Sequence, residues 1–447
     1  MKVRDPIHGF IEYGDKEEQI INTRIFQRLR GIKQLALASF VYPGAHHTRF
    51  EHSLGVMHLA GKVGHQLELK DQVDNLRLAG LLHDIGHDPF SHVSEQVIED
   101  QMVDRKKILK KYHAQNVQEL LSILLIENND EINGILSDTE RDGIIDLLNK
   151  GERRSIEKDI ISGPLDVDKF DYLLRDAYFA GVKYGVFDLE KVIESLTPIR
   201  ISREEEQLGI KDEGIYSVEQ LLLAKYHMNV QVYQHRIRRI VDAMLVKGIE
   251  YALEEGIDEI KSIFEFEDSQ EFLSNFIQVD DNEVVRIVRS KSDGWAGDIF
   301  KRIAERRLFK EIYQVEVDYR NFKDAVSLKN AMNPSYDQKE RITNKIAEHL
   351  KVPSELVIFD LQSNSNPTFK SPQVTIDTKT MMVNTPTGLR QTFPEGSTVF
   401  NNTSINPQKT SIHIYASLDE RGDREMRKKF IDGVKETLSE IIGDELT

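Results

Sequence analysis

The sequence contains no cysteine among its 447 residues. That absence excludes disulfide scaffolds, zinc–thiolate sites, iron–sulfur clusters and thiol catalysis, so any bound metal must be held by histidine, carboxylate or other oxygen donors. No run approaches the roughly 20 apolar residues that cross a bilayer, and no apolar stretch follows the charged N-terminus as it would in a signal peptide. We therefore expect a cytoplasmic protein that does not associate with a membrane.

Basic residues are also fewer than acidic residues. Lys and Arg number 59 against 75 Asp and Glu, which gives a formal net charge of −16. Such a chain lacks the basic footprint of a nucleic-acid binder, so nucleic acid is not the expected partner. If the substrate is itself an anion, clustered Arg and Lys or metal ions must make its site locally positive.

The sequence pattern changes along the chain. Apolar residues recur at helical spacing over residues 51–69, 76–85, 117–127, 168–180 and 218–253. A charged run at 202–207 between two apolar segments predicts a hairpin. Further on, strands are expected at 315–317, 356–361, 374–376 and 412–415, with a final helix over 423–442. We predict a mainly α protein, with an all-helical body of residues 1–255 and a smaller α+β lobe of residues 256–447 that serves oligomerisation or regulation.

Histidine is concentrated in one region. Nine of the fourteen histidines lie within 68 residues, namely His46, His47, His52, His58, His65, His83, His87, His92 and His113. Taken singly, each is more often a surface or core residue than a ligand. The adjacent pair His83 and Asp84 differs, because it ends an apolar helix with side chains about 100° apart. Imidazole and carboxylate suit a divalent ion, and His52 and Asp168 are candidates to complete its site.

Several segments together resemble a known family. They are Asp5-Pro-Ile-His-Gly9, the run from Phe26 to Leu35, Arg49-Phe-Glu-His-Ser-Leu-Gly-Val56, and His83-Asp-Ile-Gly-His-Asp-Pro-Phe-Ser-His92, extended by residues 166–176 and 233–236. This set resembles the HD-domain deoxynucleoside triphosphate triphosphohydrolases, which include the mammalian SAM-and-HD-domain enzyme and bacterial relatives. The resemblance covers residues 1–250. Because its motifs begin at residue 5, no SAM domain is expected and the bacterial form is the nearer match.

The resemblance implies a catalytic centre. The implied metal ligands are His52, His83, Asp84 and Asp168. The implied catalytic groups near the scissile phosphate are His87, His92 and His113, the last with Glu95 as its acidic partner. General chemistry agrees, because phosphoryl transfer needs mainly positioning and charge neutralisation, and a histidine such as His92 can protonate a leaving alkoxide.

The resemblance also implies nucleotide contacts. Phosphate and sugar contacts would come from Arg49, Lys169, Asp176 and Tyr233. Tyr172 would stack on the deoxyribose, where a 2′-hydroxyl would not fit. The 3′-hydroxyl and the base would be touched by Gln34 and Leu35, and an activator nucleotide by Arg30 and Asn22.

The implied reaction is metal-dependent hydrolysis of a dNTP to deoxynucleoside and inorganic triphosphate. The ligand types admit Mg, Mn, Fe, Zn, Co or Ni. The family further implies a homo-oligomer, dimeric or tetrameric, and an activator nucleotide that is GTP or a dNTP.

Four positions depart from the family pattern. His113 is followed by Ala114 where the family has a carboxylate. Lys225 and Asn229 replace an arginine and a histidine of the mammalian enzyme, and Asn22 replaces an acidic residue that would read guanine. These departures bear on the proton relay, the phosphate contacts and the choice of activator.

Two other functions fit the same residues. The metal ligands suit other HD phosphohydrolases equally well, such as a ribonucleotide triphosphohydrolase, a nucleotidase or a phosphodiesterase. A nucleotide-sensing scaffold without catalysis is the second, and the basic tract Gln231–Arg239 could then contact nucleic acid. Tyr172 favours deoxyribose, and the complete set of metal ligands favours an enzyme.

Overall fold

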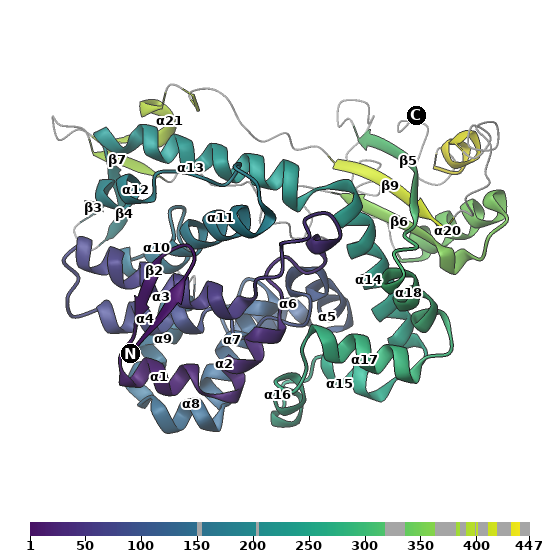
Figure 1. Cartoon of the computed structure of the whole chain (residues 1–447), viewed down its shortest axis with the longest axis horizontal. Coiled ribbons are helices and arrows are strands. Elements are labelled where there is room, and N and C mark those ends of the chain that lie inside the picture. Colours follow the sequence, from purple (N-terminus) through teal and green to yellow (C-terminus); the bar gives the residue numbers. More distant parts are fainter. Residues whose placement is uncertain are drawn as a thin grey trace. The chain divides into compact units, whose positions relative to one another are not determined.

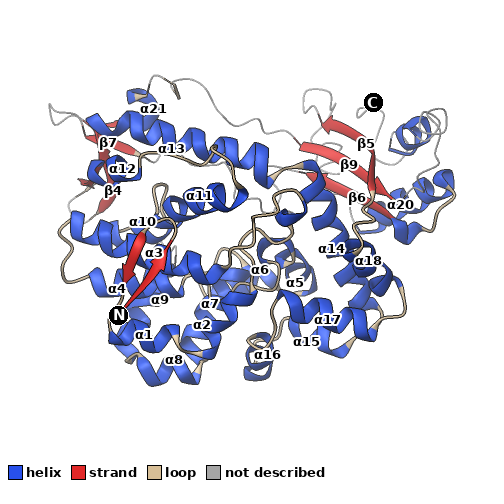
Figure 2. Ribbon diagram, viewed as in Figure 1, coloured by secondary structure: helices blue, strands red, loops and turns tan. Residues whose placement is uncertain are grey.

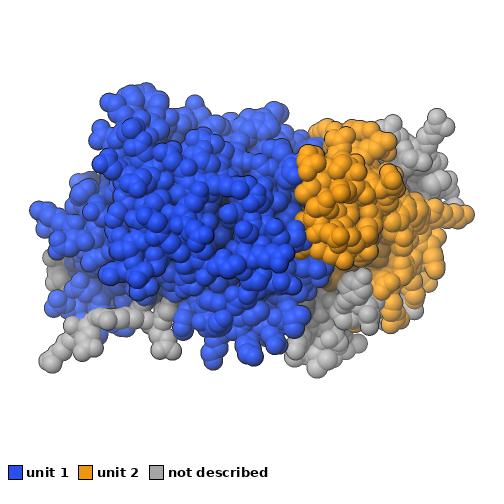
Figure 3. Space-filling view, turned by 90° about the horizontal axis from the view of Figure 1, so that it is seen from below, with its two compact units in different colours: residues 1–235, 262–284, 372–406 blue, residues 236–261, 285–371, 407–447 orange. Residues whose placement is uncertain are grey.

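The structure is a computed structural model that describes residues 1–149, 154–202, 205–317, 336–362, 381–384, 390–397, 399–400, 410–417 and 431–438. The described chain is mainly helical, which confirms the predicted fold class (Figure 2). Two compact units share the chain (Figure 3). Unit 1 comprises residues 1–235, 262–284 and 372–406, and unit 2 comprises residues 236–261, 285–371 and 407–447.

Unit 1 begins with an antiparallel hairpin of β1 (Lys2–Asp5) and β2 (Gly9–Glu12), and Figure 1 labels β2 near the N-terminus. Its first helices are α1 (Asp15–Ile21), α2 (Arg24–Arg28), α3 (Arg49–Gln66), α4 (Val73–Leu82), α5 (Glu95–Gln101), α6 (Arg105–Lys111) and α7 (Val117–Asn128). They are followed by α8 (Asp130–Ile135), α9 (Asp138–Leu148), α10 (Ile156–Ser162), α11 (Val167–Ala180), α12 (Leu189–Ser195) and α13 (Ile215–Met228). Helix α16 (Gln270–Phe276) also belongs to unit 1, whereas α15 (Asp258–Phe264) and α17 (Asp281–Lys291) cross between the units.

Helix α3 lies at the centre of unit 1, packed against α4 and α11. It begins two residues before the predicted range of 51–69, because Thr48 and Glu51 form a capping box, and it ends at Gln66. Helix α11 starts in a similar way, where the side chain of Asp166 accepts a hydrogen bond from the Lys169 N–H at 2.9 Å. It ends at Gly181, whose φ of 71° is the left-handed conformation typical of a helix C-terminus.

Two predicted helices have different ends from those expected. The helix predicted over 76–85 stops at Leu82, because the His83 carbonyl accepts hydrogen bonds from Gln118 and Ser122 of α7 instead of continuing the helix. The segment predicted as helical over 218–253 is interrupted by a π-helical turn, Asn229–Tyr233, before α14 (Arg236–Glu254). Both interruptions bring functional candidates out of regular helix.

Unit 1 also contains a four-stranded sheet in the order β3-β4-β7-β8. The strands are β3 (Leu196–Arg200), β4 (Glu206–Lys211), β7 (Met382–Asn384) and β8 (Arg390–Thr392), followed by the short helix α21 (Phe393–Gly396). The predicted hairpin is confirmed by the antiparallel pairing of β3 and β4. Strand β7 pairs with β4 in parallel and with β8 in antiparallel orientation.

Unit 2 is built on α14, α18 (Trp295–Ala304), α20 (Tyr336–Leu350) and a three-stranded antiparallel sheet. In that sheet β9 (Thr410–Ala416) lies between β5 (Lys310–Val317) and β6 (Val357–Gln362), which confirms three predicted strands. The predicted strand at 374–376 lies outside the described residues, and of the predicted final helix residues 431–438 are described and are helical. Ile342, Ile346, Ile412 and Ile414 are fully buried in the core of this unit. Nowhere in the described chain is a helix both long and apolar enough to span a membrane.

Candidate metal and phosphate site

Three helices of unit 1 bring the four predicted metal ligands together. His52 lies near the start of α3, His83 and Asp84 follow α4, and Asp168 lies in the first turn of α11. The Nε2 atom of His52 is 3.0 Å from an oxygen of Asp168 and 3.6 Å from one of Asp84. The Nε2 atom of His83 is 3.2 Å from Asp84 and 3.9 Å from Asp168. Ligands bound at about 2.1 Å to one ion lie roughly 3–4 Å apart. The ligand atoms of His52, His83 and Asp84 all lie within 4.8 Å of one another and fit a shared divalent cation, with Asp168 beside the two histidines.

The hydrogen bonding of the two imidazoles also fits a metal site. The Nε2 atoms of His52 and His83 are buried and have no hydrogen-bond partner. Their Nδ1 atoms are engaged, by Asp171 at 2.7 Å and by the Gly80 carbonyl at 2.8 Å respectively. A proton held on Nδ1 leaves the Nε2 lone pair for a metal, which is the usual arrangement in histidine ligation. Burial opposes a charge on His52, yet the facing carboxylates of Asp168 and Asp171 outweigh it and raise the His52 pKa to about 10. These carboxylates favour positive charge at this position, and a bound cation would supply that charge in place of the proton on Nε2.

Asp171 is the centre of a buried network that the sequence did not reveal. Its carboxylate contacts His52, His8 at 2.6 Å and the Arg175 guanidinium at 2.8 Å, and Arg175 reaches Asp5 at 2.8 Å. The Asp5-Pro-Ile-His-Gly9 motif is thereby connected to a metal ligand. One signal was available, because Asp168, Asp171 and Arg175 recur at helical spacing on one side of α11.

The close packing of α3 on α11 depends on a glycine. A Cβ atom at Gly55 would lie 1.9 Å from the Asp171 carboxylate and 2.6 Å from the Arg175 guanidinium. Glycine is therefore the residue that leaves room for the buried network beside His52.

Arg49 supplies a buried positive charge next to the metal ligands. Its Nη1 donates to Asp84 at 2.7 Å and its Nε to the Ser91 hydroxyl at 3.1 Å. Burial would raise the Asp84 pKa, but the charges of Arg49 and His83 hold it well below its usual range. Burial and the Arg49 charge lower the His87 pKa to about 3, so His87 is neutral at pH 7.

The predicted catalytic histidines separate into two groups. The His92 ring lies 4.8 Å from that of His87, with its Nδ1 3.4 Å from Glu95. The side chain of His92 is 36% exposed, so it has access to solvent and substrate, whereas Glu95 is buried. His113 lies exposed just after α6, with a φ of 53°. In the structure the imidazole beside Glu95 is therefore that of His92.

Two lysines add positive charge around Asp168. Lys169 donates to the Gly163 carbonyl at 3.0 Å and forms an ion pair with Asp166. Lys225 of α13 is buried, and its burial together with repulsion by Lys169 lowers its pKa to about 7. The Asn229 side chain that follows is buried with its Oδ1 unpaired. The two lysines provide the local positive charge that an anionic ligand would require in an acidic protein.

Two aromatic residues predicted to contact the nucleotide lie close together. The rings of Tyr172 and Tyr233 are 6.4 Å apart at 64°. Tyr233 donates to Asp176 at 2.7 Å, and His47 contacts the other oxygen of the same carboxylate at 2.7 Å. His47 was not among the predicted site residues, although it stacks on Phe179 and fixes Asp176.

The remaining predicted contacts lie in the first 35 residues. Gln34 and Leu35 are both buried, and the Gln34 Oε1 atom has no hydrogen-bond partner. Arg30 and Asn22, predicted to contact an activator, are exposed. The Arg30 guanidinium lies 3.4 Å above the Phe50 ring, which places it on the outer surface of unit 1.

The sequence of this chain is similar to those of known proteins. Two family models match the chain, the HD domain at residues 49–176 and the HD associated region at residues 187–393. The protein YwfO of Bacillus subtilis, which is uncharacterized, is 30% identical over 331 residues that cover 69% of this chain and 71% of that protein. The chain belongs to the HD-domain family.

Other members of the HD-domain family are similar to this chain. An uncharacterized protein of Methanocaldococcus jannaschii is 34% identical over 69% of this chain. A Dictyostelium discoideum protein described as a deoxynucleoside triphosphate triphosphohydrolase SAMHD1 homolog is 32% identical over 70% of it. The chain spans 59% and 60% of the lengths of these two relatives.

Two solved structures have a similar fold over nearly the whole of this chain. A hypothetical protein of Aquifex aeolicus matches 97% of this chain and 99% of its own with a TM-score of 0.70. A phosphohydrolase of Bacteroides thetaiotaomicron matches 94% of this chain and all of its own with a TM-score of 0.69. Each is 25% identical to this chain.

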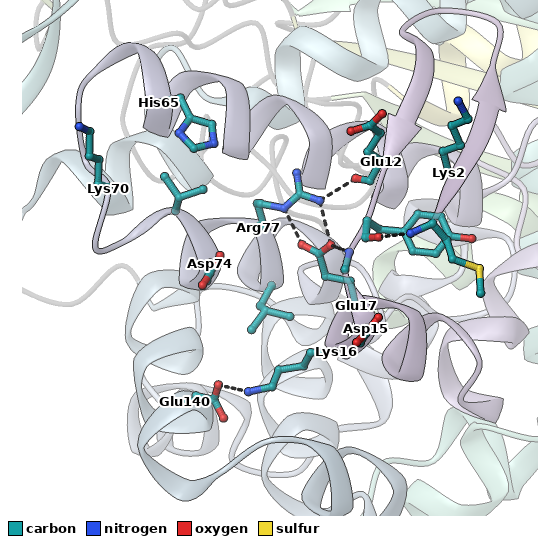
Figure 4. A pocket seen from close by; sticks show the side chains of 15 residues that line it. Lys2, Glu12, Asp15, Lys16, Glu17, His65, Lys70, Asp74, Arg77 and Glu140 are labelled. Atoms are coloured by element: carbon teal, nitrogen blue, oxygen red, sulfur yellow. Dashed lines mark hydrogen bonds and ion pairs between the residues drawn. The ribbon is translucent and has the colours of Figure 1, made fainter.

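A cavity of unit 1 lies beside the N-terminal hairpin and has a volume of about 920 Å³ (Figure 4). Charges of both signs line it and pair with each other, since Arg77 contacts Glu17 at 2.9 Å and Lys16 forms an ion pair with Glu140. None of the four predicted metal ligands is among its lining residues. The pairing leaves little net charge for a phosphate ligand, so we assign the cavity no role.

Proposed function

We propose that the chain is a metal-dependent hydrolase that converts dNTPs to deoxynucleoside and inorganic triphosphate. The observation that carries the proposal is the convergence of His52, His83, Asp84 and Asp168, with two unpaired imidazole nitrogens, beside buried Arg49. The relative from Dictyostelium discoideum, described as a deoxynucleoside triphosphate triphosphohydrolase homolog, supports the substrate class. A divalent ion held by these four residues would polarise a phosphate oxygen.

The chain's own residues would then perform five tasks. Arg49, Lys169 and Lys225 neutralise the triphosphate, which is the main requirement of phosphoryl transfer. His92, held by Glu95 and open to solvent, donates a proton to the 5′-oxygen as it leaves the α-phosphorus. His87, neutral at pH 7, offers a second imidazole beside the ligand Asp84.

The remaining two tasks concern the sugar and the base. Tyr172 packs on the deoxyribose and disfavours a 2′-hydroxyl, while Asp176, held by Tyr233 and His47, accepts a hydrogen bond from the 3′-hydroxyl. Gln34 and Leu35 face the nucleoside. In the same proposal Arg30 and Asn22 belong to an activator-nucleotide site, and the active protein is a homo-oligomer.

The test is a product assay. Purified protein is incubated with Mg²⁺ or Mn²⁺ and each dNTP singly, with all four together, and with the four ribonucleoside triphosphates, in each case with and without GTP. We expect deoxynucleoside plus triphosphate, with ¹⁸O from labelled water in the triphosphate. Release of phosphate or pyrophosphate, or equal turnover of ribonucleotides, would contradict the proposal.

The matched variants are His83→Ala and His46→Ala. His83 faces the proposed metal, whereas His46 is exposed in the same histidine-rich region. We expect His83→Ala to lose both bound metal and hydrolysis, and His46→Ala to retain both. Activity only in mixtures or with GTP would support the activator site.

A further inference from the structure

A strained turn lies between the two histidines proposed to act near the scissile phosphate. Phe90 and Ser91 have φ angles of 67° and 55°, which is the left-handed region for two consecutive non-glycine residues. This conformation is strained for a residue with a side chain and persists only where its surroundings hold it. The turn joins His87 to His92, so its shape determines where His92 stands.

Asp281 holds this turn. One oxygen of its buried carboxylate accepts the Phe90 N–H at 2.7 Å, and the other accepts the Lys33 N–H at 3.1 Å. The Ser91 hydroxyl donates to the Lys33 carbonyl at 3.0 Å and accepts from Arg49. One carboxylate thus ties the turn before His92 to the turn before Gln34.

The segment around Asp281 is itself anchored to the same region of unit 1. Arg28 donates to the carbonyls of Val279 at 2.8 Å and His87 at 2.7 Å, and its guanidinium lies 4.4 Å from the Phe276 ring. Gly31 permits the approach, because a Cβ atom there would lie 2.1 Å from the Asp280 carboxylate. Asp280 caps the start of α17 by accepting the Glu283 N–H at 2.9 Å.

We propose that Asp281 is a positioning residue of the active site, which holds the strained Phe90–Ser91 turn so that His92 and Arg49 are placed for catalysis. The inference deepens the proposed hydrolysis and rests on it. Asp281 lies more than a hundred residues beyond the HD-domain match, within the HD associated region. That region would thereby contribute to catalysis without touching the substrate.

The test compares Asp281→Asn with Asp280→Asn. Asparagine at position 281 keeps one acceptor and turns an NH₂ group toward the other N–H, so one of the two ties is lost. We expect kcat to fall about 10- to 100-fold with KM and bound metal nearly unchanged, since small misplacements of catalytic groups have effects of this size. Asparagine at 280 still caps α17, so both kinetic constants should stay within about twofold.

Hydrogen–deuterium exchange separates this inference from the proposed hydrolysis. Peptides covering residues 29–36 and 86–94 should exchange faster in Asp281→Asn and not in Asp280→Asn, whether or not any substrate is turned over. If the wild type is inactive but the variants show this exchange pattern, the proposed hydrolysis is contradicted, whereas the role of Asp281 in holding the two turns together is supported. Unchanged exchange, or a variant with unchanged kcat, would overturn the role of Asp281. If Asp281→Asn fails to fold, rapid exchange of the Lys33 and Phe90 amides in the wild type would overturn it.

Discussion

At the scale of single residues, the orientation of His52 depends on Asp171. The carboxylate that holds the His52 Nδ1 atom also neutralises buried Arg175 and contacts His8. Residues in this position behind a histidine ligand typically affect metal affinity by 10- to 100-fold. We therefore expect Asp171 to affect metal binding without itself contacting the metal.

Replacing Asp171 gives the first prediction. We expect Asp171→Asn to weaken Mn²⁺ or Fe²⁺ binding by about 10- to 100-fold and to destabilise unit 1 by about 3–5 kcal/mol, because Arg175 would lose a buried ionic partner. Chelator competition and thermal unfolding measure the two effects. Asp188→Asn, at the exposed cap of α12, is the control and should alter neither. Unchanged metal affinity in Asp171→Asn would contradict the role assigned to the network.

A second prediction concerns Lys225 and pH. Its pKa is lowered to about 7, so the side chain is charged below pH 7 and loses its proton as the pH rises through 7. If it binds phosphate, the KM for dNTP should rise between pH 6 and 8.5. Lys225→Arg keeps its charge throughout and should show a KM that changes much less over this range. Steady-state kinetics measure the pH dependence of KM, with the exposed Lys70→Arg variant as the control. If KM changes with pH in the same way in Lys225→Arg and in the wild type, Lys225 does not bind the phosphate.

The sequence could single out the four residues proposed as metal ligands, which the structure brings close together, because their types and neighbours form recognisable local motifs. It could not identify Asp171, His8, His47 or Asp281 in the same way. Their contacts span 163 residues for His8 with Asp171 and 191 residues for Phe90 with Asp281. Such pairs depend on how distant segments pack, which no local pattern encodes.

At the scale of elements, the fit of α3 against α11 is controlled by Gly55. We expect Gly55→Ala to destabilise unit 1 by about 1–3 kcal/mol, because its methyl group would overlap the Asp171 carboxylate. Metal binding should weaken with it. Gly134→Ala provides the matched control, since the new methyl group on exposed α8 meets nothing within 4 Å and should stabilise by about 0.5–1 kcal/mol. Thermal denaturation of both variants measures the difference, and equal stabilities would contradict the packing described for α3.

Most helices and three strands of the sheet in unit 2 were predictable, since caps such as Thr48 and Asp166 and apolar periodicity are local signals. The order β5-β9-β6 was not, because strand order and register follow from pairings between residues far apart in the chain. The early end of α4 at Leu82 was missed for a related reason. The groups that satisfy the His83 carbonyl come from α7.

At the scale of the whole molecule, all four proposed metal ligands belong to unit 1 and the single tryptophan, Trp295, belongs to unit 2. A ligand at 100 times its dissociation constant stabilises the folded state by about 2.7 kcal/mol. We therefore expect saturating Mn²⁺ to raise the unfolding midpoint measured by circular dichroism by about 5 °C or more. His83→Ala should abolish the shift and His46→Ala should preserve it. Trp295 fluorescence reports unit 2, and a shift of the same size there would mean that both units unfold together.

The contact between His8 and Asp171 has a consequence for the living cell. These residues are 163 positions apart, and a ribosome adding about 5–20 residues per second needs roughly 8–30 s to go from one to the other. Throughout that interval His8 and His52 lack the carboxylate that contacts both of their rings. The proposed metal site therefore cannot take this form until α11 has been synthesised. A metal-delivery step that uses the site must wait for α11 to leave the ribosome.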